Sequence, residues 1–232
     1  MVKTQPDSVK CSTHNGGMNA CLPPPPPAEI PAESAADAPR DLRQIVLATA
    51  RALLDEQGVT GLSMREVARR AGVTHQAPYH HFGDRESILA AVLVQGFDEL
   101  ATRMQTALAR SAAGGGRAMM LAAANAYVGF ALANPGVFGV MFRREICNPI
   151  RFPEVRHAGA RAHHELERLV HAIHGPTADA ALTSIYWAHA HGLACLMIDG
   201  PLSLQMTDEA QRDTHLQAVG NQFAKAMLSL VQ

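Results

Sequence analysis

From Asp41 onward, apolar residues recur at intervals of three and four, the spacing of an α-helix with one buried face. The first such segment includes Leu42, Ile45 and Leu53 and reaches Gly58, a residue type that favours a helix end. Further helices are expected at about 63–72, 74–82, 84–114, 118–133, 135–145, 154–174, 178–198 and 208–231. No segment alternates like a strand. The pattern therefore predicts an all-α protein of about nine helices.

Residues 1 to 39 lack this periodicity. They are poor in aromatic and branched apolar residues and contain a run of five prolines, Pro23 to Pro27. Such a composition favours a disordered tail with a stiff polyproline stretch. A spacer is the favoured interpretation, and a ligand for an aromatic groove is the alternative.

Composition places the chain among cytoplasmic proteins. The four cysteines show no paired spacing, and neither a signal peptide nor a membrane-spanning apolar run is recognisable. The formal net charge of −1 argues against a protein that coats nucleic acid through bulk charge. Any DNA binding must therefore come from a local surface.

Two short helices between Ser63 and Phe82 form the most informative motif. Ser63 and Glu66 fit a reciprocal capping box, and Thr74 and Asp84 are expected to cap the next two helices. Only the turn Ala71-Gly72-Val73 separates these two short helices, and this is the layout of a helix-turn-helix. The second helix of such a motif enters a DNA major groove, and Pro78 is tolerated in its first turn.

The segment "LSMREVARRAGVTHQAPYHHFGDRESILAAVL" resembles the DNA-binding region of TetR-family transcriptional regulators. "YWAHAHGLACLMIDG" resembles the Trp-His-Gly pattern of one C-terminal subgroup of that family. The resemblance implies a homodimer with a three-helix helix-turn-helix domain at 40–88. It also implies a larger helical domain for ligand sensing and dimerisation at 89–232.

Carried onto this chain, the resemblance assigns base and phosphate contacts around the motif. Gln76 can pair with adenine, Arg65 with guanine, and a methyl group at position 77 can pack on thymine. The expected DNA-contacting residues are Arg65, Thr74, His75, Gln76, Ala77, Tyr79, His81 and Arg85.

The second domain is expected to enclose an apolar cavity. Methionine and aromatic side chains with a few polar groups match a small-molecule pocket, although a packed core is the alternative for each residue. The expected lining is Met119, Tyr127, Phe130, Phe138, Met141, Trp187 and His191. No lysine or arginine is placed there, which favours an apolar or aromatic effector.

The last two long helices are expected to form a four-helix dimer interface, because each repeats apolar residues at spacings of three and four. The expected interface residues are Ile185, His189, Gly192, Leu196, Leu216, Val219, Phe223, Met227 and Leu230. Cys147 and Cys195 are expected to be buried.

These features predict a non-enzymatic repressor that binds a palindromic double-stranded DNA operator as a homodimer and is released by a small molecule. Cofactor motifs, nucleophile constellations and metal-ligand spacing are not recognisable, so no cofactor, metal or membrane partner is expected. A metal- or redox-responsive regulator of the same fold, and an adaptor that uses the proline-rich tail, stay open as alternatives.

Overall fold

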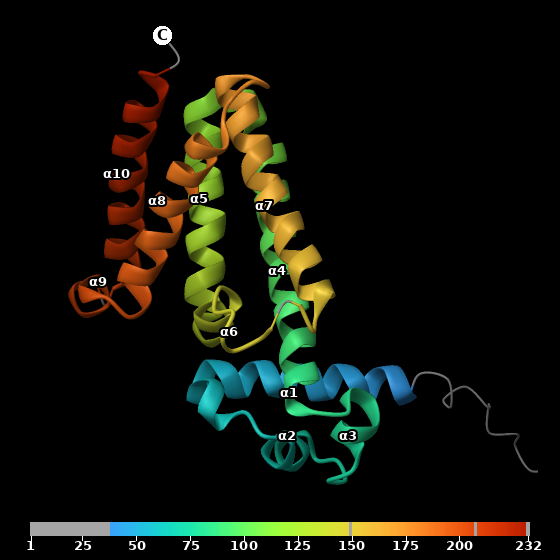
Figure 1. Ribbon diagram of the computed structural model, residues 1–232. Coiled ribbons are helices and arrows are strands. Elements are labelled where there is room, and N and C mark those ends of the chain that lie inside the picture. The colour runs from blue at the N-terminus through green and yellow to red at the C-terminus, as the bar shows by residue number, and fades with distance from the viewer. Residues whose placement is uncertain (1–37, 149, 207, 231–232) are drawn as a thin grey trace, which may run out of the picture. The chain divides into compact units, whose positions relative to one another are not determined.

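The computed structural model describes residues 38–148, 150–206 and 208–230, all within one compact unit that begins at Asp37. These residues form α-helices and one 3-10 turn without a strand, which confirms the all-α class (Figure 1). The elements are α1 (Ala38–Gly61), α2 (Met64–Ala71), α3 (Ala77–Phe82), α4 (Arg85–Ser111), η1 (Ala112–Gly114), α5 (Gly115–Ala133), α6 (Pro135–Met141), α7 (Pro153–His174), α8 (Ala180–Ile198), α9 (Pro201–Gln205) and α10 (Glu209–Leu228). The short α9 was not expected. Apart from its last two residues, the expected tail lies outside the described residues.

The first three helices follow the expected caps only in part. Gly58 interrupts α1 with a φ of 65°, as its position suggested. Ser63 Oγ accepts a hydrogen bond from the Glu66 amide at 3.2 Å, but the Glu66 carboxylate pairs with Arg69 and Arg70. Only one half of the expected capping box is therefore present.

The turn before α3 is longer than the sequence suggested. Gly72 has a φ of 67°, a left-handed conformation that glycine adopts without strain, and the Val73 amide donates to the Ala68 carbonyl at 3.1 Å. The helix begins at Ala77, so the expected cap at Thr74 is wrong; that residue forms a backbone turn with Ala77 instead. Pro78 lies in the first helical turn, where its missing N–H costs no helical hydrogen bond.

Helix α4 connects the three N-terminal helices to the rest of the chain. It contacts α1 and α3 near its start and packs along α5 and α7, while α8 and α10 contact α5 (Figure 1). Leu93, Leu100, Phe130 and Leu169 are among the buried side chains of this core. Burial of each such side chain contributes about 1.5–3 kcal/mol relative to exposure.

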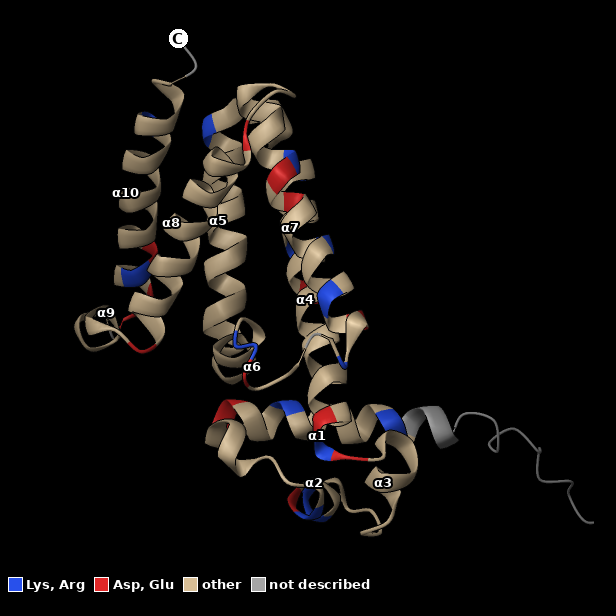
Figure 2. Ribbon diagram, viewed as in Figure 1, with Lys and Arg blue, Asp and Glu red and all other residues tan. Residues whose placement is uncertain are grey.

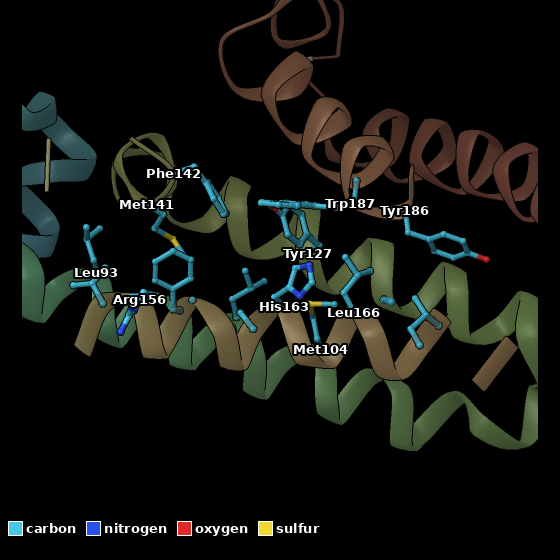
Figure 3. Close-up of a pocket in the computed structure, with 18 of the residues that line it drawn as sticks. Leu93, Met104, Tyr127, Met141, Phe142, Arg156, His163, Leu166, Tyr186 and Trp187 are labelled. Carbon is cyan, nitrogen blue, oxygen red and sulfur yellow. The ribbon is translucent and has the colours of Figure 1, made fainter. Parts of the chain in front are cut away.

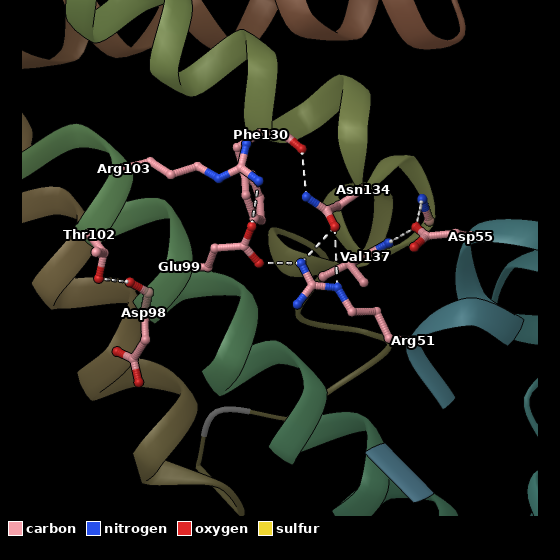
Figure 4. A network of polar contacts seen from close by, with 10 residues as sticks. Arg51, Asp55, Asp98, Glu99, Thr102, Arg103, Phe130, Asn134 and Val137 are labelled. Atoms are coloured by element: carbon pink, nitrogen blue, oxygen red, sulfur yellow. Dashed lines mark hydrogen bonds and ion pairs between the residues drawn. The ribbon is translucent and has the colours of Figure 1, made fainter. Parts of the chain in front are cut away.

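A polar junction joins α1 to α6 and α4 (Figure 4). The Asp55 carboxylate accepts from the Gly136 and Val137 amides at the start of α6, at 2.8 and 3.3 Å. Arg51 donates to Asn134 Oδ1 and also pairs with Glu99 of α4. A carboxylate at a helix N-terminus is favourable because free amides and the helix dipole converge there.

Within the described residues, no single helix is long and apolar enough to cross a membrane. Two segments, Arg85–Ala133 and Pro135–Met141, reach that length and apolarity only together, and they are bent by 108° relative to each other.

Gly136→Ala is expected to destabilise the junction between α1 and α6. An added Cβ would lie 2.0 Å from the Leu54 carbonyl oxygen, which belongs to the backbone and cannot rotate away. We expect a loss of about 1–3 kcal/mol in the free energy of unfolding, measured by denaturant titration. Gly139→Ala is the matched control on the same helix, because its Cβ would meet nothing within 4 Å. Equal stabilities of the two variants would contradict this account of the junction.

Candidate functional site

The α3 region presents a polar surface. Thr74, His75, Gln76, Tyr79 and His80 are exposed, and the His75 and Tyr79 rings lie 5.7 Å apart. Helix α3 carries no acidic residue, lysine or arginine, as its colour shows (Figure 2). The surface can therefore form hydrogen bonds and stacking contacts but supplies no fixed positive charge.

The nearby arginines of α2 differ in their availability. Arg69 and Arg70 bind the Glu66 carboxylate at 2.7 and 3.0 Å, and hydrogen bonds from Arg69 and then Arg70 lower the pKa of Glu66 to about 2. Arg70 also pairs with Glu56. Arg65, at the start of α2, is exposed, and no ion pair involves it among the described residues. Arg65 is thus the α2 arginine most available to an external anion.

Two of the expected DNA contacts are less accessible than their neighbours in the α3 region. Ala77 is only 9% exposed because the first turn of α3 faces the core, so its methyl group is not available to a thymine. His81 is half-buried at the end of the same helix. His80, which was not among the expected contacts, is exposed.

Arg85 is engaged within the three-helix unit. Its Nε donates to the Leu62 carbonyl at 2.6 Å, and its Nη2 donates to the Val59 carbonyl at 2.5 Å. Both carbonyls lie at the end of α1 and in the linker to α2, where helical partners are missing. Arg85 therefore holds the three-helix unit together, and this geometry does not support the expected phosphate contact.

A pocket of about 800 Å³ lies between α4, α5, α7 and α8 (Figure 3). One face of α4 lines it with Leu93, Phe97, Leu100 and Met104. The part of the helix from Leu93 to Met104 is about 16 Å long, at a rise of about 1.5 Å per residue. Most of the remaining wall is apolar. An elongated apolar molecule fits such a space better than a compact polar one.

Two polar side chains of the pocket lining, Tyr127 and Trp187, form hydrogen bonds with each other or with His191. The Tyr127 hydroxyl lies 2.9 Å from His191 Nδ1 and accepts from Trp187 Nε1 at 3.2 Å. Burial raises the pKa of Tyr127 and lowers the pKa of His191, so both groups are neutral near pH 7. At the end of the pocket opposite to Leu93, the Tyr186 hydroxyl lies 2.7 Å from His174 Nε2 (Figure 3).

Three of the seven expected pocket residues, Tyr127, Met141 and Trp187, line the cavity. The other four do not. Phe130 is fully buried, and Phe138 and His191 pack behind the wall, with their rings 5.2 Å apart. Met119 is half-buried against the core. The helix pattern identified α5, α6 and α8 but missed α4 and α7, and it could not resolve which turn of each helix faces the cavity.

Several lining residues were missed from the sequence. Arg143, Arg144 and Arg156 line the pocket, as do His163 and His189. His189 stacks on Phe223 at 3.9 Å, and its Nε2 is the buried side-chain polar atom without a partner among the described residues. The adjacent pair Arg143-Arg144, directly after the apolar residues Val140, Met141 and Phe142, was the available signal.

The expected dimer residues divide into two groups. Ile185 and Leu196 are 47% and 44% exposed on α8, and Cys195, expected to be buried, is exposed there too. The apolar residues of α10 are instead packed against the core of their own chain. These are Leu216, Val219, Phe223 and Met227, whereas Leu230 is 65% exposed.

Comparison with known proteins gives matches in both halves of the chain. A family model described as "Bacterial regulatory proteins, tetR family" matches residues 46–92, and "Tetracyclin repressor-like, C-terminal domain" matches residues 120–219. A curated relative, the uncharacterized HTH-type transcriptional regulator YobS of Bacillus subtilis, is 28% identical over 96 residues. That match covers 41% of this chain and 49% of YobS, about half its length.

Two solved structures share the fold. A protein of unknown function from Rhodococcus sp. RHA1 has a TM-score of 0.64 and 29% identity, covering 85% of this chain and 98% of that one. The transcriptional regulator FadR from Bacillus subtilis, solved in complex with stearoyl-CoA, has a TM-score of 0.62 and 14% identity. That match covers 80% of this chain and 97% of FadR.

Arg85→Ala is expected to lower the free energy of unfolding by about 1–3 kcal/mol, because two carbonyls lose a charged donor. Arg65→Ala is the matched control, since this arginine is exposed. The free energy of unfolding of that variant should stay within about 0.5 kcal/mol of the value for the unaltered protein. Thermal and denaturant unfolding measure both. Unchanged stability of the Arg85→Ala protein would contradict the structural role of Arg85 and favour the expected phosphate contact instead.

Proposed function

Because the chain belongs to the TetR family of bacterial transcriptional regulators, we propose that it binds a palindromic operator as a homodimer and leaves it when a small molecule occupies the pocket. That it is a helix-turn-helix regulator rather than an enzyme follows from the matches in both halves. Operator reading, dimerisation and ligand response are the proposed parts.

The exposed side chains in the α3 region support the proposal of operator binding. Gln76 is exposed at the start of α3, where the second helix of this motif meets base edges, and its amide can pair with adenine N6 and N7. Tyr79 and His75 lie beside it, and Arg65 can approach from α2. With so little local charge, affinity depends on direct contacts and on two half-sites bound together.

The exposed apolar residues of α8 support the proposal that the chain dimerises through this helix. Ile185 and Leu196 are separated by three helical turns and so share one face of α8. The nearby Gly192 has open space around its Cα, which would let a partner helix approach closely. The exposed face of α10 is available to the same interface, but Phe223 is committed to packing inside its own chain.

Two contacts connect the pocket to α1 and α4, the helices that contact α3. Helix α6 carries Met141 of the pocket wall at one end and is held by Asp55 of α1 at the other. Arg151, next to the pocket residue Ile150 in the chain, pairs with Asp84 and Glu86 at the start of α4, directly after α3. A ligand that moves either element would therefore displace α3, and ligand and operator would weaken each other reciprocally.

The FadR structure supports the idea of a small-molecule effector, because the same fold holds stearoyl-CoA in that protein. At 14% identity this likeness concerns the fold alone. The effector of this chain has to be argued from its own pocket residues.

Gln76→Ala is expected to weaken specific operator binding by about 1–3 kcal/mol and to relax the preference at one base pair in each half-site. The measurement is a mobility shift against the operator and against scrambled DNA of equal length. Gln105→Ala, an exposed glutamine on α4, is the matched control. Equal losses on operator and scrambled DNA would exclude base reading by Gln76, and the absence of any palindrome-specific shift in the unaltered protein would refute the proposed function.

Ile185→Asp is expected to convert the dimer into monomer, because a carboxylate would be buried without a partner in the interface. Light scattering gives the mass in solution. Ile45→Asp on α1 is the control, since Ile45 is similarly exposed, at 42%, but lies away from α8. A mass of two chains for the Ile185 variant would exclude α8 as the interface.

A further inference from the structure

Building on the proposed ligand response, we infer that the effector is an anionic amphiphile. It would have a linear apolar chain that occupies the pocket and an anionic headgroup held by Arg143, Arg144 and Arg156. This assignment replaces the uncharged effector expected from the sequence, which placed no arginine at the pocket.

The three arginines mark one end of the cavity. Arg156 lies at the end where Leu93 and Met141 are found, while Tyr186 lies at the opposite end (Figure 3). Arg143 and Arg144 follow Met141 closely in the chain and line the same pocket. All three are exposed, and among the described residues no carboxylate forms an ion pair with them. Their charge is available to a bound anion.

The charge balance of this rim is locally positive in a chain whose formal net charge is −1. Between residues 143 and 156 there are four arginines, the three above and Arg151, against Glu145 and Glu154. Arg151 is occupied by Asp84 and Glu86. The other three remain to attract an anion, and a guanidinium binds carboxylate or phosphate oxygens through two parallel hydrogen bonds.

The rest of the cavity requires a long apolar body. Its lining runs about 16 Å along α4 from Leu93 to Met104, with Leu166, Leu169 and Phe223 toward the Tyr186 end. The hydroxyls of Tyr127 and Tyr186 are already paired with histidines, so they require nothing from a ligand. The unpartnered His189 Nε2 can take one neutral hydrogen bond, but burial lowers the pKa of this side chain and so disfavours a charge there.

The test titrates the full chain with laurate and palmitate, below their micelle concentrations, and follows the fluorescence of Trp187, the single tryptophan and a pocket residue. Methyl laurate and dodecylamine are the neutral and cationic comparisons. We expect the acids to bind at least about tenfold more tightly than either, on the scale of several ion pairs formed together. Palmitoyl-CoA distinguishes the source of the anion, since tighter binding than palmitate would identify a phosphate-bearing headgroup.

The Arg143→Gln, Arg144→Gln, Arg156→Gln triple variant should bind laurate about tenfold more weakly and methyl laurate unchanged. Because the three side chains are exposed, this variant should fold, and its thermal unfolding confirms it. Arg110→Gln, an exposed arginine of α4 outside the pocket, is the matched control and should bind laurate normally.

The headgroup assignment is overturned if methyl laurate or dodecylamine binds as tightly as laurate, or if the triple variant retains full laurate affinity. It is also overturned if no apolar acid perturbs Trp187. Operator release is measured separately by mobility shift. Laurate binding without operator release would support the ligand class and contradict the proposed regulation. Release by neutral compounds alone would support the regulation and contradict the ligand class.

Discussion

The contact between α1 and the start of α6 is the constraint on which the rest of the structure depends. Gly136 lies so close to the Leu54 carbonyl that no larger residue fits, and Asp55 accepts from the first free amides of α6. Arg51 extends the contact to Asn134 and to Glu99 of α4. Asn134 is buried, and a buried polar group needs its partners, so this junction has one well-satisfied geometry, and it fixes α1 relative to the helices that surround the pocket.

The same arrangement explains how one small fold can combine two separate surfaces. The exposed side chains of α3 and the apolar pocket share no residue, but α4 starts directly after α3 and lines the pocket from Leu93 onward. Arg151 links the segment at the pocket rim to Asp84, which itself caps α4 through the Ser87 amide at 2.8 Å. The residues beside the pocket are thus connected through Arg151 to the start of α4, directly after α3.

Much of the fold could be predicted from the sequence because helix periodicity and capping are local properties. The periodic apolar residues located the long helices, Gly58 and Gly72 marked backbone positions with positive φ, and Asp84 capped α4 as expected. The two short helices with a glycine turn indicated a helix-turn-helix through their local spacing alone. Where the prediction failed locally, as at Thr74, a backbone turn replaced the side-chain cap, and both satisfy the same amides.

The chain's own sequence therefore determined its fold class, its helix order and the motif at residues 63–82. Only the tertiary structure decided which side chains of that motif are free, because Ala77 is buried and Arg85 binds the carbonyls of Val59 and Leu62. It also decided that Phe223 packs against His189 of its own chain and that Arg156, distant from Leu93 in sequence, lies at the same end of the pocket (Figure 3). The physical reason is that periodicity identifies the apolar face of a helix, whereas the partner of that face depends on contacts between residues far apart in the chain.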